Sequence, residues 1–244
     1  MIWPSPRVST SPWNRDASNR TFAIMKKLLT TWVTFDCYGT LIDWETGIGA
    51  FFRETLGAEE LLDEWERVQF EMIQGPYRTY AQIMARSLRQ VLEAHGMPYG
   101  DELGEAFVRS LPAWRPFPET NPALEQLRGK RLKLGIISNI DDALLRETVR
   151  HFTVPFDLLV TAEQARAYKP TAAGFRLALE RIGLPPSQVT HVAFGDRYDL
   201  ATARSCGMQV IFVNRHAKRI GTPVDAEIRD LSELPGVLEQ MLRL

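Results

Sequence analysis

Short apolar runs alternate with segments of helical periodicity along the second half of the chain, and this alternation limits the possible folds more than any other feature. Strands are predicted at 132–137, 156–160, 191–194 and 209–213, and a further one at 32–35. Helices are predicted after them, from Asp141 or Asp142, then through Phe175, Leu179 and Ile182, and over 201–205 and 231–242. Such alternation is typical of a parallel sheet covered by helices on both faces. The sequence therefore predicts an α/β fold.

The chain between the first two predicted strands has a helical pattern instead. Apolar residues recur at helix-face spacing over 61–73 and again over 80–92, with Gly75-Pro76 between them, and a third helix is predicted over 101–111. Two prolines in Trp114-Arg115-Pro116-Phe117-Pro118 indicate a linker. We therefore predict a core domain made of 26–43 and 118–244, with 44–117 inserted as a helical cap subdomain.

Composition excludes several classes of function. The 244 residues are 45% hydrophobic with a formal net charge of −1, which argues against nucleic acid or anionic lipid as a partner. Two cysteines imply no disulfide framework and fit a cytoplasmic location. No apolar run reaches the ~18–20 residues that span a bilayer, so no membrane partner is expected.

The first residues differ from the rest of the chain. Residues 1–25 contain three prolines among Ser, Asn and Arg, without helical or strand periodicity, and are predicted to be a disordered extension. A targeting peptide is the alternative, because basic residues there outnumber the lone Asp16. An apolar segment followed by a small-residue cleavage site is not evident.

Polar side chains fall at corresponding places of the strand–helix alternation. Asp36, Ser138 and Asp196 each follow a predicted strand, and Lys169 lies in a loop that enters a helix. One acid after a strand is usually a turn or helix cap. Because ligands bind at the carboxyl edge of parallel sheets, four such groups together predict an active site on that edge.

Each of these groups has a plausible chemical task. Asp36 can act as a covalent nucleophile whose ester is then cleaved by water. Lys169 can keep Asp36 ionised, and Thr40 can fix its rotamer by a hydrogen bond. Ser138, Asn139 and the amides of the following helix turn can bind an anionic group of the substrate.

The motifs that carry these residues resemble those of the haloacid dehalogenase superfamily. The four motifs are Asp36-Cys37-Tyr38-Gly39-Thr40, Ser138-Asn139, Lys169-Pro170 and Gly195-Asp196-x-x-Asp199. Three further stretches are similar to the L-2-haloacid dehalogenase branch, namely 136–139, 167–170 and 212–215. The resemblance runs from about residue 30 to the C-terminus, and implies a Rossmannoid (HAD-like) core with an active site under an inserted cap.

Tyr38 supports this branch by a chemical argument. The phosphatases of the superfamily have a second Asp two residues after the nucleophile, which protonates the leaving alkoxide. A tyrosine with a pKa of about 10 replaces it poorly, whereas a halide leaves without a proton. Tyr38 packing against the cap would equally disable phosphatase chemistry.

Two positions depart from the branch. The resemblance implies an arginine directly after a cap-helix tryptophan, in contact with the departing halide, but Trp65 is followed by Glu66 and then Arg67. One helical position is a rotation of about 100°, so Arg67 is either the halide contact or a solvated surface charge.

The second departure is Asp196, which stands where the branch commonly has an amide. Asp36, Asp196 and Asp199 resemble the oxygen ligands that bind Mg²⁺ in the phosphatase relatives. Alternatively, Asp199 caps its helix or anchors Lys169.

These observations lead to one favoured function and two alternatives. The favoured function is hydrolytic dehalogenation of short (S)-2-haloalkanoic acids through an ester on Asp36, with water, without a cofactor, and in a homodimer as the resemblance suggests. The first alternative is a Mg²⁺-dependent phosphohydrolase with Asp36 as phosphoryl acceptor and Asp196 on the metal. The second is a catalytically weak relative with a binding role.

The predicted site comprises two groups of residues. The predicted catalytic residues are Asp36, Thr40, Ser138, Lys169, Asp196 and Asp199. The predicted substrate-binding residues are Tyr38, Arg67, Phe70, Asn139 and Tyr198.

Overall fold

The computed structural model describes residues 32–243, with side chains through Met241, and contains one parallel sheet. Its strands are β1 Trp32–Phe35, β2 Lys133–Ser138, β3 Leu158–Thr161, β4 Val189–Ala193, β5 Gln209–Val213 and β6 Ala226–Ile228. The six strands lie in the order β3-β2-β1-β4-β5-β6. This confirms the predicted α/β fold, while the predicted extension over 1–25 lies outside the described residues.

The strand order places β1 at the point where the chain changes direction across the sheet. Phe35 at the end of β1 is in register with Ile136 of β2 on one side and Val192 of β4 on the other. The carboxyl ends of these three strands are therefore level. In open parallel sheets such a switch point is where ligands bind.

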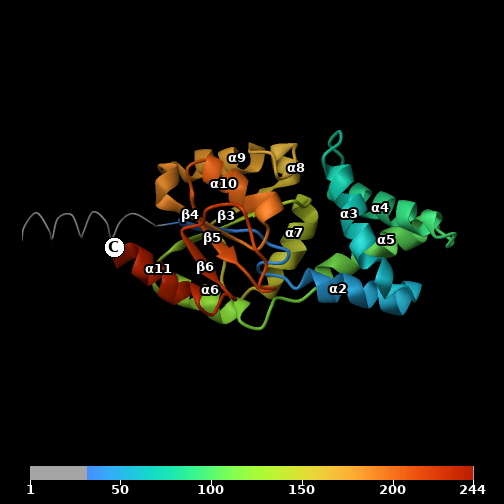
Figure 1. The fold of residues 1–244 in the computed structure, drawn as a ribbon, viewed down its shortest axis with the longest axis horizontal. Coiled ribbons are helices and arrows are strands. Elements are labelled where there is room, and N and C mark those ends of the chain that lie inside the picture. The colour runs from blue at the N-terminus through green and yellow to red at the C-terminus, as the bar shows by residue number, and fades with distance from the viewer. Residues whose placement is uncertain (1–31, 244) are drawn as a thin grey trace, which may run out of the picture.

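Helices cover both faces of the sheet (Figure 1). One face carries α6 Thr120–Gly129 and α11 Leu234–Arg243, and the other carries α8 Ala162–Ala165, α9 Ala173–Ile182 and α10 Ala201–Ser205. Helix α7 Asp142–Thr148 follows β2. The core also contains short 3-10 turns at Val149–His151 and Pro186–Gln188, and a π-helical turn at Asp196–Leu200. Leu124 and Leu238 are buried in the first layer, and Phe175 and Ala203 in the second.

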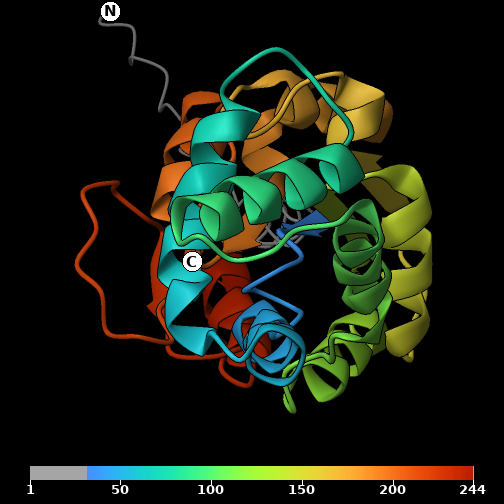
Figure 2. The same ribbon diagram turned by 90° about the vertical axis from the view of Figure 1, so that its right-hand side faces the viewer.

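A second group of helices lies beyond the carboxyl ends of the strands, and its members between Trp44 and Ala113 are called the cap below (Figures 1 and 2). It contains α2 Trp44–Phe51, α3 Leu62–Ile73, α4 Tyr80–Ala94 and α5 Asp101–Ser110. A π-helical turn, Phe52–Leu56, and 3-10 turns at Glu59–Leu61 and Leu111–Ala113 complete it. The predicted helices over 61–73, 80–92 and 101–111 are thereby confirmed.

The chain crosses between core and cap twice, and the two crossings are bonded to each other. The Asp43 amide donates to the Arg115 carbonyl at 2.9 Å, and the Phe117 amide donates to the Leu41 carbonyl at 3.1 Å. Arg215 from the core donates to the Thr40 carbonyl at 3.0 Å. These hydrogen bonds hold the two crossing segments together, and the pair of segments is called the hinge below.

Core and cap also touch on the far side of the hinge. The carboxylate of Asp141, in the loop after β2, accepts hydrogen bonds from the amides of Tyr80 at 2.7 Å and Ala81 at 2.9 Å. The Tyr168 hydroxyl donates to the Arg78 carbonyl at 2.8 Å. Hydrogen bonds therefore join core and cap on two sides of the space between them. Among residues 32–243, no helix has the length and apolar character needed to cross a bilayer.

Candidate active site

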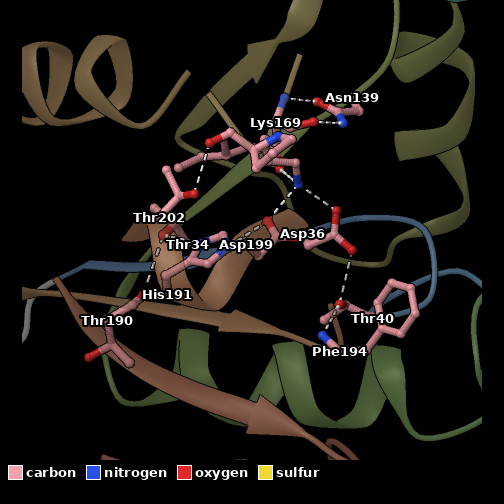
Figure 3. A network of polar contacts seen from close by, with 12 residues as sticks. Thr34, Asp36, Thr40, Asn139, Lys169, Thr190, His191, Phe194, Asp199 and Thr202 are labelled. Atoms are coloured by element: carbon pink, nitrogen blue, oxygen red, sulfur yellow. Dashed lines mark hydrogen bonds and ion pairs between the residues drawn. The ribbon is translucent and has the colours of Figure 1, made fainter. Parts of the chain in front are cut away.

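The loop after β1 presents the Asp36 carboxylate at the sheet edge. Gly39 has a φ of 95°, and a Cβ on it would lie 2.3 Å from the Phe194 ring, so only glycine fits this turn. The turn brings the Thr40 hydroxyl back to Asp36, where it donates to Oδ2 at 3.1 Å (Figure 3). Thr40 in turn accepts from the Phe194 amide at 3.1 Å, which fixes its orientation.

Lys169 joins three strand ends through its ammonium group. Its Nζ donates to Asp36 Oδ1 at 2.8 Å, to the Ile137 carbonyl at 2.9 Å and to Asp199 Oδ1 at 2.7 Å (Figure 3). These contacts use all three protons of an ammonium. The Lys169 side chain is only 3% exposed, so the charge is held away from solvent.

Asn139 holds the backbone of Lys169. Its Nδ2 donates to the Lys169 carbonyl at 3.0 Å, and its Oδ1 accepts from the Lys169 amide at 2.6 Å. This double contact positions the lysine, whereas the sequence predicts Asn139 as a substrate contact. The Ser138 hydroxyl beside it is buried without a hydrogen-bond partner among the described residues.

Burial and charge shift the pKa values of the three central groups in different directions. Burial raises the pKa of Asp36, and Asp199 adds to the rise, although Lys169 opposes it. Burial also acts against the charged form of Asp199, but Lys169 and His191 outweigh it and lower that pKa. Burial opposes the charge of Lys169 as well, yet the two carboxylates raise its pKa. Burial thus favours the neutral form of Asp36, whereas the neighbouring cation and histidine favour the charged form of Asp199.

His191 of β4 contacts the carboxylate of Asp199. Its Nε2 lies 3.1 Å from Asp199 Oδ1, and its Nδ1 lies 3.0 Å from the Thr34 hydroxyl. Asp199 thus anchors Lys169, which is one of the three roles that the sequence leaves open for it. His191 itself is not among the predicted site residues.

A pocket of about 80 Å³ lies between this cluster and the cap. By the measure in which roughly 10–15 Å³ holds one water, this space suits a small organic molecule. Predicted site residues on its wall are Asp36, Tyr38, Ser138, Asn139, Lys169, Tyr198 and Asp199. Cap and hinge add polar or aromatic side chains that the predicted site does not include, among them Trp65, Glu66, Gln69, Tyr80 and Trp114.

The expectation that Arg67 contacts the substrate is wrong. Its side chain is 57% exposed and pairs with Glu71 at 2.9 Å and Glu64 at 3.8 Å on the outer surface of α3. Glu66 lies on the pocket wall instead. The rotation of one helical position has turned Arg67 toward solvent.

Phe70 and Asp196 are also not brought into the pocket. Phe70 is buried against the Tyr198 ring, with a centroid distance of 4.9 Å, and supports that wall from behind. Asp196 turns toward the loop before β6, where its Oδ2 accepts from the Gly221 amide at 3.4 Å. Neither belongs to the residues that line the pocket. The predictions that place these two residues in the site are therefore wrong for the pocket wall.

Tyr38 lines the pocket but directs its hydroxyl away from Asp36. The Tyr38 hydroxyl lies 2.8 Å from Thr148 Oγ1, whose own proton is donated to the Leu144 carbonyl at 3.1 Å. Tyr38 is therefore the donor to Thr148. Burial raises its pKa well above the usual range for tyrosine. A proton held in this way is not available to a leaving group.

The residues do not fit the Mg²⁺ site of the phosphatase alternative. Asp36 Oδ1 and Asp199 Oδ1 both accept from the Lys169 ammonium, which supplies the positive charge there. Asp196 lies outside the pocket. Within the described part of the chain, no three His, Cys, Asp or Glu residues are grouped so that they could share a metal ion.

Comparison with known proteins identifies the class that this fold and site define. A sequence profile of haloacid dehalogenase-like hydrolases matches residues 30–207, and the chain belongs to this family. The (S)-2-haloacid dehalogenase 2 of Pseudomonas sp. strain CBS-3 is 29% identical over 222 residues, which cover 84% of this chain and 94% of that protein. The (S)-2-haloacid dehalogenase H-109 of Pseudomonas putida is 27% identical over 217 residues, covering 83% and 95%.

Solved structures agree with the sequence relatives. The L-2-haloacid dehalogenase PA0810 matches with a TM-score of 0.77 at 25% identity, covering 86% of this chain and 99% of that chain. Together with the sequence matches, this confirms the resemblance to the L-2-haloacid dehalogenase branch.

Proposed function

We propose that this protein hydrolyses the carbon–halogen bond of short (S)-2-haloalkanoic acids. One observation carries the proposal: a buried carboxylate, Asp36, lines a small pocket and is held by Lys169 and Thr40. The hydroxyl of Tyr38, two residues after Asp36, is bonded to Thr148 instead. Such a site favours a leaving group that needs no proton. The names of the relatives point to the same substrates.

The first step forms an ester on Asp36. A carboxylate oxygen of Asp36 attacks Cα of the substrate, the carbon–halogen bond breaks, and the halide leaves with the bonding electron pair. Attack from the side opposite the halogen inverts Cα. The hydrogen bonds from Lys169 and Thr40 engage one oxygen each, so they orient the carboxylate while leaving it lone pairs for attack.

The second step restores the enzyme. Water adds to Cγ of the Asp36 ester, and the bond between Cγ and the ester oxygen that is attached to Cα breaks. A 2-hydroxy acid and a proton are released. The oxygen that enters the product in the first turnover therefore comes from Asp36, and water replaces it on the carboxylate. The cap keeps bulk water from the nucleophile during the first step.

The substrate carboxylate has a donor ready in the core. Ser138 Oγ is buried on the pocket wall and lacks a partner among the described residues. A buried hydroxyl without a partner costs about 1–3 kcal/mol, and a bound carboxylate would remove that cost. Asn139 acts beside it as a positioning residue through Lys169.

Halide release measured with a matched pair of variants tests this function. The wild type is incubated with (S)-2-chloropropionate and, separately, an aryl phosphate, each with EDTA or Mg²⁺. We expect metal-independent chloride release that is lost in Asp36→Asn and kept in Arg67→Gln, because Arg67 lies outside the pocket. A single turnover in isotopically labelled water should give unlabelled product. Phosphate release that requires Mg²⁺, with no chloride release, would refute the proposal.

We extend the proposal to the setting of the enzyme. It uses no metal cofactor, since Lys169 supplies the positive charge beside Asp36. A cytoplasmic location fits the free thiols of Cys37 and Cys206. A homodimer follows from the family resemblance, and light scattering of the purified protein measures it directly.

A further inference from the structure

Among residues 32–241, whose side chains the structure describes, the pocket wall has no free cation to receive a departing halide. Lys169 is the one basic residue among the described side chains that line the pocket, and its three protons are used. Arg67 faces solvent, and its neighbour Glu66 adds an acid to the wall. An anion formed in this pocket must therefore be bound by uncharged donors.

Two indole groups on the cap side are such donors. Trp65 of α3 is 1% exposed and Trp114, at the second crossing to the core, is 5% exposed, and both side chains line the pocket. Neither Nε1 atom has an acceptor among the described residues. An indole nitrogen can only donate, and leaving it buried without an acceptor costs free energy. Both unused donors belong to residues that line one small pocket, so a bound ligand can supply their acceptor.

We propose that the Nε1–H groups of Trp65 and Trp114 together bind the halide that leaves the substrate. This rests on the proposed function and deepens it by naming the leaving-group site. The halide takes the bonding electron pair from Cα and accepts two hydrogen bonds, and no proton is transferred. The positive edge of an aromatic ring suits a large, weakly hydrated anion. Uncharged donors also allow the halide to dissociate before the next turnover.

The packing around both indoles fixes their positions before any substrate arrives. Within the cap, the Trp65 ring makes edge-to-face contacts with Phe107 and Phe52, with centroid distances of 5.3 Å and 6.4 Å. Trp114 lies edge-on to Tyr38 at 6.0 Å and rests on Gly47, where a Cβ would come within 2.4 Å of its ring. The donors are therefore preorganised for charge that develops during the reaction.

Glu66 works against an anion in the same space. Its carboxyl group has no hydrogen bond or ion pair within the described part of the chain, although Lys218 and Arg197 lie close enough to offset some of its charge. Replacing Glu66 by glutamine keeps the shape of the wall and removes the negative charge. That substitution should tighten halide binding, which is the opposite of the effect expected at the indoles.

Chloride binding to the resting enzyme tests the site without turnover. Line broadening of the chloride NMR signal is followed at constant ionic strength for the wild type, Trp65→Phe, Trp114→Phe and Glu66→Gln. The control is Trp32→Phe, the same change at the start of β1, outside the pocket. Each pocket Phe variant should bind chloride about tenfold more weakly, the control should match the wild type, and Glu66→Gln should bind more tightly. Circular dichroism checks that each variant is folded.

The outcomes separate this inference from the proposed function. Equal chloride affinity in the wild type and both pocket variants, or no chloride binding by the wild type, would overturn the indole site. Loss of affinity in Trp32→Phe as large as in the pocket variants would overturn it too. Indole-dependent chloride binding without halide release from any 2-haloalkanoate would instead refute the proposed function and leave the site standing.

Discussion

Replacing Lys169 by methionine tests the electrostatic core of the site. Methionine preserves most of the side-chain length and removes the charge. In the native protein the ammonium satisfies two buried carboxylates, Asp36 and Asp199, and the Ile137 carbonyl. Without it, two negative groups lie close together in a site that excludes water.

The size of the effect follows from these contacts. Removing one partner of a buried ion pair costs about 3–5 kcal/mol, because the other charge stays buried and uncompensated. A typical domain has only about 5–15 kcal/mol of stability, so the variant should be strongly destabilised at neutral pH. Protonation of Asp36 relieves the repulsion, and a protonated carboxyl is not a nucleophile. Halide release should therefore be lost at the same time.

Urea unfolding at about pH 7 and about pH 5 measures the loss of folding free energy in Lys169→Met. The unpaired carboxyls bind protons more tightly in the folded than in the unfolded state, so the deficit of Lys169→Met relative to the wild type should shrink as pH falls through their raised pKa values. The double variant Lys169→Met with Asp199→Asn should be more stable than the single one by about 1–3 kcal/mol. A single variant within about 1 kcal/mol of the wild type at both pH values, or a less stable double variant, would refute this reasoning.

Two further predictions concern the groups around Asp36. Thr40→Val keeps the side-chain shape but removes the donor to Asp36 and the acceptor of the Phe194 amide. The kcat for halide release should therefore fall about tenfold or more, with little change in KM. A changed KM with an unchanged kcat would contradict this prediction. The charge of Asp199 raises the pKa values of both Asp36 and Lys169, so Asp199→Asn should move the acid limb of the kcat/KM pH profile to lower pH. An acid limb that stays in place or rises would count against the assigned coupling.

The sequence predicts the core of the site well because strand ends are easy to locate. Asp36 and Ser138 follow apolar runs whose parallel pairing forces them to one edge, so their proximity follows from topology alone. Lys169 and Asp199 meet there as well, although Lys169 lies in a loop and Asp199 in the π-helical turn after β4. The motif spacing of the family resemblance, rather than periodicity, located these two.

The far side of the pocket was harder to predict for a physical reason. On a helix a single position changes the facing direction, which separates Arg67 from Glu66. Aromatic residues such as Trp65 and Phe70 have the same pattern whether they line a pocket or pack behind it. Helix α6 also went unpredicted, since Pro122 lies in its first turn, where proline is tolerated but looks like a break.

The contact between Asp141 and α4 couples the stability of the first turn of this cap helix to the position of the cap relative to the core. The first amides of a helix lack partners within it, and two of those in α4 are satisfied by a carboxylate that belongs to the core. Moving the cap away would leave both amides to water and loosen the first turn of α4. Asp141 lies three residues after Ser138, in the loop that follows the end of β2. A shift of that loop on substrate binding would therefore be transmitted directly to the cap as a change in helix end stability.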